Sequence, residues 1–272
     1  MSGHSLAANH VASAGATVTM VAHLRGLRSK NILTIAELDL AAEAALLSLH
    51  TSFETFVREL YLECITGSTQ ITGVRSKLRA SSAEDAQALV TGDRPFVEWL
   101  PLGKTLDRAL VHLHGGQPFV RLWQRDQVMR HLNLLHVVRN RVAHSSEQAL
   151  RKYETQVSRG DAAFHRPARW LLHAPSSKTN FELLADSTTA ACQDLSADVR
   201  TPILLGPAVV SDGQQGAPGK YRCVTCGRVQ HRPTWSPLAP CPQCSTTRTC
   251  PSCSEVKRSK SKWRLETLRA VT

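Results

Sequence analysis

A stripe of apolar residues at helical spacing restricts the fold of this chain more than any other feature of its sequence. Its members follow one another in steps of three and four: Leu38, Ala42, Ala45, Leu49, Phe53, Phe56 and Leu60. Side chains at this spacing share one face of an α-helix, and an apolar face must be covered by a core. Thr34 and Glu37 stand just before the stripe at the spacing of a capping box. The pattern therefore predicts a long core helix from Thr34 to about Cys64.

The composition favours helices packed on helices over a β-sheet. Apolar residues make up 42% of the 272 residues but aromatic residues only 5%, and alternation with period two is confined to short stretches. We therefore expect an all-α main domain, a helical bundle over residues 34–198. Further helices are expected at 71–90, 96–114, 119–144 or 126–144, 146–157 and 179–195. Residues 1–33 are weakly patterned and are expected to form an N-terminal extension, and residues 199–219 a linker.

Six cysteines near the C-terminal end have the spacing of metal ligands. They form three Cys-x-x-Cys pairs: Cys223 with Cys226, Cys241 with Cys244, and Cys250 with Cys253. The first two pairs are separated by fourteen residues, which resembles a zinc ribbon with four thiolates around one structural zinc ion. We expect this module at residues 220–255. The third pair could replace the second, share a second ion with His231 or another ligand, or stay free.

Positive charge is concentrated in the same part of the chain. From Gly219 onward there are eleven Lys and Arg but only two Glu, so this part carries +9 of the total formal charge of +11. Such a segment favours a polyanionic partner such as nucleic acid. In the basic tail, residues 256–272, Lys260, Lys262 and Arg264 are expected to contact phosphates while a base stacks on Trp263. Docking of a protein and a merely solvated tail are the alternatives.

A charged residue interrupts the apolar face of the helix predicted to end near residue 144. On a helical wheel this face collects Val128, Leu132, Leu135, Val138 and Val142. Arg139 falls inside the face, where a guanidinium needs a paired or polyanionic partner because removing a charge from water is costly. Asn140 and His144 are four residues apart and stack on a neighbouring face.

Arg139, Asn140 and His144 together read Arg-Asn-x-x-x-His at the end of a predicted helix. In this respect the chain resembles the HEPN superfamily, whose signature is Arg, a polar residue, three variable residues and His near the end of a core helix. The resemblance covers residues 34 to about 198 and is closest to bacterial endoribonuclease toxins and antiviral systems. It implies metal-independent cleavage of RNA at a two-fold homodimer interface. Many relatives carry an acidic residue on an earlier helix, which Glu54 matches here.

The residue types suit the chemistry that this resemblance implies. The imidazole of His144 can take a proton from a ribose 2'-hydroxyl or return one to the leaving oxygen. Arg139 can hold the scissile phosphate, and Asn140 can orient the histidine or bind the phosphate. The expected products carry a 2',3'-cyclic phosphate and a 5'-hydroxyl. Arg141 is a further candidate RNA contact, although a solvated side chain is the simpler interpretation.

Other interpretations of these residues are open at this point. Arg139 could pair with a buried carboxylate such as Glu54, and Glu54 could instead form an ordinary helix salt bridge with Arg58. His144 could merely stabilise the C-terminal end of its helix through the helix dipole. The alternative function is a non-catalytic HEPN scaffold whose zinc ribbon binds nucleic acid or a protein partner.

We expect the protein to be located in the cytoplasm. Cys-x-x-Cys pairs of this kind point to metal binding in a reducing compartment. The N-terminal residues lack the pattern of a secretory signal, and no apolar run approaches the ~20 residues that span a bilayer. Besides RNA, an antitoxin or another component of a defence complex is a candidate partner. His50, His136, Cys64 and Cys192 are expected to be structural residues.

Overall fold

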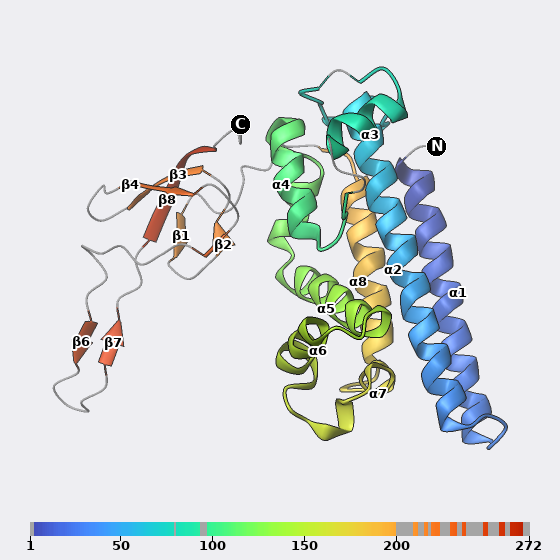
Figure 1. The fold of residues 1–272 in the computed structure, drawn as a ribbon. Helices are drawn as coiled ribbons and strands as arrows, with labels where there is room; N and C mark the ends of the chain where they lie inside the picture. Colours follow the sequence, from blue (N-terminus) through green and yellow to red (C-terminus); the bar gives the residue numbers. More distant parts are fainter. Residues whose placement is uncertain are drawn as a thin grey trace.

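The structure is a computed structural model. It describes residues 3–78, 80–92 and 97–199 and, in the C-terminal part, 209–211, 215–216, 219–223, 229–232, 236–237, 247–249, 256–258 and 262–268. The main helices of residues 3–199 are α1 (Gly3–Ser29), α2 (Ile35–Thr66), α3 (Ala83–Thr91), α4 (Leu102–His112), α5 (Asp126–Ala143), α6 (Glu147–Tyr153), α7 (Pro167–Leu172) and α8 (Asn180–Ser196) (Figure 1). Shorter helical turns are η1 (His114–Gly116), η2 (Phe119–Gln124), η3 (Glu154–Ser158) and η4 (Ala162–Phe164).

The predicted all-α main domain is confirmed. No helix in the described part of the chain is both long enough and apolar enough to cross a membrane.

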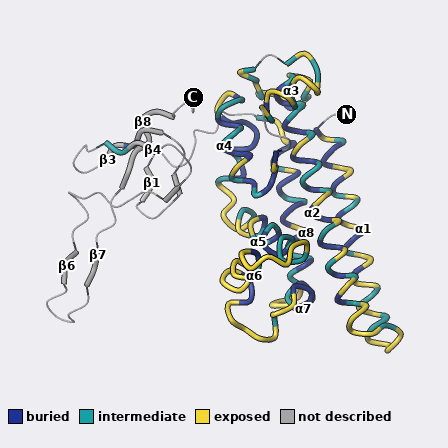
Figure 2. Tube along the Cα trace, in the orientation of Figure 1, coloured by how far each residue is buried: buried dark blue, intermediate teal, exposed yellow. Residues whose placement is uncertain are grey.

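The long helix α2 contacts most of the other helices of the bundle. The Thr34 side chain accepts a hydrogen bond from the Glu37 N–H at 3.2 Å, and Glu37 accepts one from the Thr34 N–H at 2.7 Å, so the predicted capping box is confirmed. Phe53, Phe56 and Leu60 of its apolar stripe are buried. Figure 2 places the buried residues of α2 and α8 in the middle of the bundle and the exposed residues on its outside.

The N-terminal residues belong to the bundle, so the prediction of a separate extension over residues 1–33 is wrong. α1 packs along α2 and α8, and Leu6, Ala14 and Val21 are part of the buried core. The Ser196 hydroxyl also donates a hydrogen bond to the Gly3 carbonyl at 3.0 Å. The helical domain therefore starts at the beginning of α1.

The helix predicted over residues 71–90 is wrong in its first half. In residues 71–78 the backbone forms hydrogen bonds with other segments of the chain: the Lys77 N–H donates to the His112 carbonyl at 2.8 Å. Gly73 has a φ of +85°, and a Cβ at this position would lie 2.7 Å from the Val199 carbonyl oxygen. This close approach requires glycine and excludes a helix there.

The remaining helices differ from the prediction mainly in where they begin. α3 begins after its N-cap residue Ser82. α4 begins at Leu102 and not at residue 96, in keeping with Pro101, which disfavours a helical conformation in the residue before it. α8 begins after Thr179, whose side chain forms a second capping box with Glu182, and here prediction and structure agree.

The C-terminal part contains short strands. They are β1 (Val209–Ser211), β2 (Gln215–Gly216), β3 (Gly219–Cys223), β4 (Val229–Arg232), β5 (Ser236–Pro237), β6 (Thr247–Thr249), β7 (Val256–Arg258) and β8 (Lys262–Leu268). One antiparallel sheet has the order β1-β8-β3-β4, while β2 pairs with β5 and β6 with β7. β1 lies in the predicted linker and β8 in the predicted basic tail. The sheet therefore extends beyond residues 220–255, from residue 209 to residue 268.

Candidate active site

The end of α5 brings together the three residues of the Arg-Asn-x-x-x-His pattern. Leu135 and Val138 are fully buried and anchor the helix in the bundle. His144 leaves the helix with φ −134° and ψ 133°, while its N–H still donates to the Asn140 carbonyl at 3.0 Å. The His144 side chain thereby reaches the preceding turn of α5, where Arg139 lies.

Two hydrogen bonds join these side chains and fix their polarity. Arg139 Nη1 donates to Asn140 Oδ1 at 3.1 Å and approaches His144 Nε2 at 3.3 Å. A guanidinium can only donate, so this contact is a hydrogen bond when Nε2 of the imidazole carries no proton. The arrangement places a nitrogen that can accept a proton beside a cation.

Arg139 is half-buried and has no carboxylate partner among the described residues. The alternative of an Arg139–Glu54 pair is not formed, because Glu54 Oε2 instead lies 3.8 Å from His50 Nδ1. The alternative Glu54–Arg58 bridge is not formed either, since Arg58 Nη2 lies 3.6 Å from Glu59 Oε1. Within this part of the chain, the Arg139 charge is free to meet an anion.

A cavity of about 860 Å³ lies beside this cluster. It is lined by residues of α2, α4, α5, α6, η3 and the segment before α4. Its polar lining includes His50, Glu54, His136, Arg139, Asn140 and His144, and Val97, Leu100 and Ala149 contribute apolar surface. The volume falls within the range of roughly 300–1,000 Å³ that is typical of ligand sites. Glu54 therefore shares a cavity with the three motif residues.

Two histidines that the sequence predicted to be structural also line this cavity. The ring centroids of His50 and His136 are 6.2 Å apart. Burial, with a smaller contribution from the Arg139 charge, lowers the pKa of His50 to about 3, and burial lowers that of His136 to about 4. Both rings are therefore uncharged at neutral pH. The signal that could have identified them is their spacing of four residues from Glu54 and Asn140.

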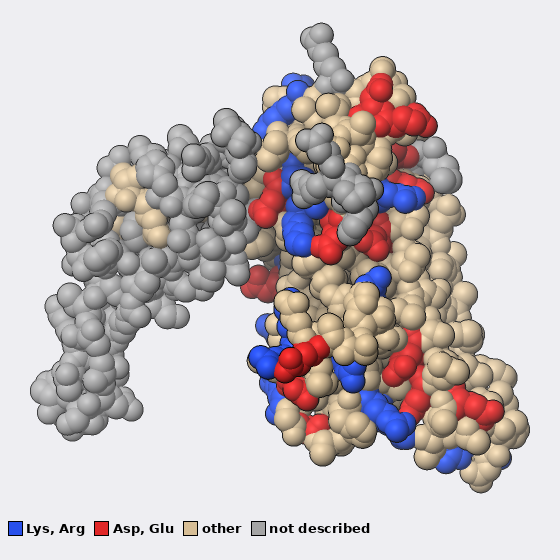
Figure 3. All heavy atoms as spheres, viewed as in Figure 1, with Lys and Arg blue, Asp and Glu red and all other residues tan. Residues whose placement is uncertain are grey.

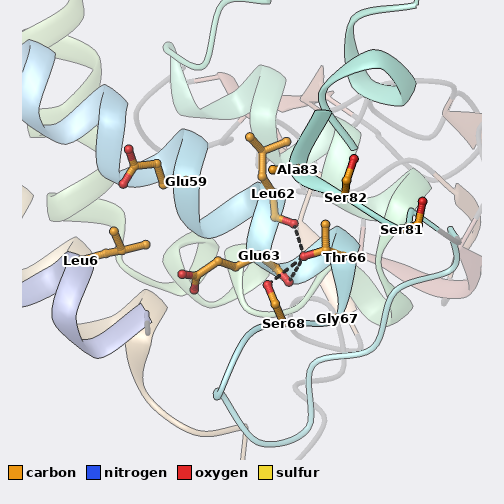
Figure 4. A pocket seen from close by; sticks show the side chains of 10 residues that line it. All are labelled: Leu6, Glu59, Leu62, Glu63, Thr66, Gly67, Ser68, Ser81, Ser82 and Ala83. Atoms are coloured by element: carbon orange, nitrogen blue, oxygen red, sulfur yellow. Dashed lines mark hydrogen bonds between the residues drawn. The ribbon is translucent and has the colours of Figure 1, made fainter. Parts of the chain in front are cut away.

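A second cavity, of about 490 Å³, lies where the start of α1 meets the end of α2 (Figure 4). Its lining contains Glu59 and Glu63 but no Lys, Arg or His. The Thr66 hydroxyl is bonded there to the Leu62 carbonyl at 3.0 Å and to the Ser68 hydroxyl at 2.8 Å. A lining with two carboxylates and no cation does not suit a phosphate, so the first cavity is the better candidate for binding nucleic acid.

Arg141 is not brought into the cavity. It lies near Glu43 and Tyr153, where burial raises the pKa of both groups and the Arg141 charge partly offsets that effect. On the face of the helical domain seen in Figure 3, Lys and Arg side chains are interspersed with Asp and Glu. We therefore find no support on this face for a broad basic surface that would use Arg141.

The predicted zinc ligands lie mostly outside the described residues. Cys223 is buried at the end of β3, whereas the other five positions, Cys226, Cys241, Cys244, Cys250 and Cys253, and also Lys260, are outside them. Lys262, Trp263 and Arg264 lie on β8, where Trp263 pairs with Cys223 across the strands. Within the described residues no group of His, Cys, Asp or Glu could hold a metal ion. The zinc module stays a prediction.

Acidification is expected to destabilise the bundle through its buried histidines. Burial lowers the pKa of His10 to about 4. Burial is also the main cause of the low pKa of His50, about 3. A histidine in an unfolded chain has a pKa of about 6.5. Between these values the unfolded chain binds more protons than the folded one, so the free energy of unfolding falls as the pH falls. At about pH 5 each of these histidines should lower the free energy of unfolding by about 2 kcal/mol relative to neutral pH.

Urea unfolding at about pH 7.5 and about pH 5 measures this loss. In His50→Gln the difference in the free energy of unfolding between the two pH values should be about 2 kcal/mol smaller than in the wild type. An identical pH dependence in the wild type and His50→Gln would show that burial of His50 has no such effect.

A search of family models, of curated proteins and of solved structures found no match for this chain. Its function is therefore inferred from the geometry of the site. Three features of that geometry matter: a half-buried guanidinium that no described carboxylate pairs with, an imidazole nitrogen beside it, and a cavity that both residues line.

Proposed function

We propose that this protein is a HEPN-type endoribonuclease that cleaves RNA without a metal ion, through attack of a ribose 2'-hydroxyl on the adjacent phosphate. The observation that carries the proposal is the 3.3 Å contact between Arg139 Nη1 and His144 Nε2 in the wall of the cavity. It places a group that can bind a phosphate beside a nitrogen that can accept a proton. These are the two groups that this reaction requires.

In the proposed reaction the scissile phosphate binds to Arg139 and replaces His144 as a partner of the guanidinium. The freed Nε2 of His144 accepts the proton of the 2'-hydroxyl, whose oxygen attacks phosphorus. The bond from phosphorus to the 5'-oxygen breaks, and the leaving oxygen takes a proton from an imidazolium, either this His144 after it has accepted the 2'-proton or a protonated His144 of a second copy. Arg139 stabilises the charge that develops on the phosphate oxygens. The products are a 2',3'-cyclic phosphate and a 5'-hydroxyl.

The proposal includes a homodimer and a structural zinc ion. In a two-fold dimer the same patch of both copies is buried, so the two motifs would meet, and the second His144 would be available to protonate the leaving oxygen. The thiolates of Cys223, Cys226, Cys241 and Cys244 would hold zinc and so fold the C-terminal module. The basic residues of that module would then recruit RNA or a partner protein, in antiviral defence or in a toxin–antitoxin pair.

End-group analysis of cleaved RNA tests this proposal. The purified protein should cut RNA in the presence of EDTA, and mass spectrometry should find 2',3'-cyclic phosphates at the new ends. The downstream fragments should accept label from a polynucleotide kinase without prior phosphatase treatment. Fragments with 5'-phosphates, or cleavage that requires added Mg²⁺, would contradict the mechanism. RNA that stays intact would favour the non-catalytic scaffold.

A further inference from the structure

A line of hydrogen bonds extends from the Arg139–His144 pair to the inner wall of the cavity. Arg139 Nη1 donates to Asn140 Oδ1 at 3.1 Å, and Asn140 Nδ2 lies 2.9 Å from His136 Nε2. Because the guanidinium can only donate, the amide oxygen must face Arg139, and the amide nitrogen must then donate to His136. The Nε2 of His136 is therefore an acceptor, and the proton of this ring lies on Nδ1.

We propose that His136 is a positioning residue for the proposed cleavage, because it fixes the Asn140 amide that holds Arg139 against His144. The expected effect on cleavage rests on the proposed function, whereas the hydrogen bonds of His136 and Asn140 do not depend on it. Without an acceptor at position 136, the amide would keep only the bond from Arg139 and would lose the contact that holds its nitrogen. The Asn140 side chain could then rotate away from the guanidinium. Arg139 would lose the contact that keeps it beside His144.

The surroundings of His136 support this role over that of a core residue. Its Nδ1 is buried and has no hydrogen-bond partner among the described residues, a cost to folding that a purely structural side chain would be expected to avoid. The neighbouring His50 ring lies 6.2 Å away. Burial lowers the pKa of His136 to about 4, so that Nε2 stays an acceptor at neutral pH.

Three substitutions on α5 test the inference by cleavage kinetics. His136→Phe keeps a ring of similar size but removes the acceptor, and we expect kcat to fall about 10²-fold with little change in KM. His136→Gln should recover most of this loss, because its carbonyl oxygen can accept from Asn140. His131→Phe is the matched control, since His131 bonds Ser187 at 2.7 Å outside the cavity, and its kcat should equal that of the wild type. An unchanged kcat in His136→Phe, or equal losses in His136→Phe and His136→Gln, would overturn the proposal.

Nuclear magnetic resonance without RNA separates this inference from the proposed function. The side-chain amide protons of Asn140 should exchange slowly with solvent in the wild type and in His136→Gln, and fast in His136→Phe. Equal exchange in all three proteins would refute the positioning role even if the protein cuts RNA. The expected difference would support that role even if every RNA stayed intact.

Discussion

The substitution His144→Ala is expected to slow RNA cleavage by about 10²- to 10⁴-fold, the range found when a general acid–base group is removed. The reason is the position of its Nε2, which lies 3.3 Å from Arg139 Nη1 in the wall of the cavity and can accept a proton there. Arg139→Ala should lose about 10²- to 10³-fold, because the charge on the phosphate would develop without a guanidinium to stabilise it. Arg139→Lys should recover little of this loss, since an ammonium cannot bond a phosphate in the same two-pronged way.

Single-turnover cleavage rates measure these effects without interference from product release. Arg130→Ala is the control, because Arg130 is exposed on the same helix and does not line the cavity. Thermal unfolding should be similar for all variants, since Arg139 is only half-buried and His144 is exposed. A wild-type rate in His144→Ala would exclude this residue as the proton acceptor.

The substitution Ala14→Glu is expected to lower the free energy of unfolding of the helical domain by about 3 kcal/mol or more. Ala14 lies on the face of α1 that packs into the core and is 2% exposed. A carboxylate at this position would be buried one turn from His10, whose imidazole is kept uncharged by burial that lowers its pKa to about 4. Ala12→Glu is the matched control on the exposed face of the same helix and should change stability by about 0.5 kcal/mol or less. Urea unfolding followed by circular dichroism compares the two, and equal stabilities would mean that α1 does not form part of the core.

The features of the fold that depend on residues close together in the sequence could be predicted from it. The capping box of Thr34 and Glu37 and the apolar stripe after it are local signals, and α2 follows both. α1 was missed because its buried positions include small residues such as Ala7 and Ala14, which do not stand out from the Ala, Gly and Ser around them. The pairing of β1 with β8 joins segments about fifty residues apart, and no local pattern in the supposed linker predicts it.

The site was predictable only in part, for a similar reason. Arg139, Asn140 and His144 form one short pattern, but the contact between Arg139 and His144, five residues apart, forms because His144 leaves the helix. The position of His50 in the same cavity depends on the packing of α2 against α5, which the sequence alone does not define. The burial that keeps His50 and His136 uncharged arises from the same packing.

The most direct measurement of the proposed activity compares two RNAs and two proteins in EDTA. One RNA is entirely ribose, and the other carries a single 2'-deoxy nucleotide on the 5' side of the mapped cleavage site. We expect the wild type to cut the first RNA at that site and to leave the same site of the second intact, because the attacking hydroxyl is missing there. His144→Ala, purified in parallel, should cut the first RNA about 10²- to 10⁴-fold more slowly and leave the same site of the second intact. Cleavage of the deoxy-substituted site, or equal cleavage by the wild type and His144→Ala, would contradict a ribonuclease centre at Arg139, Asn140 and His144.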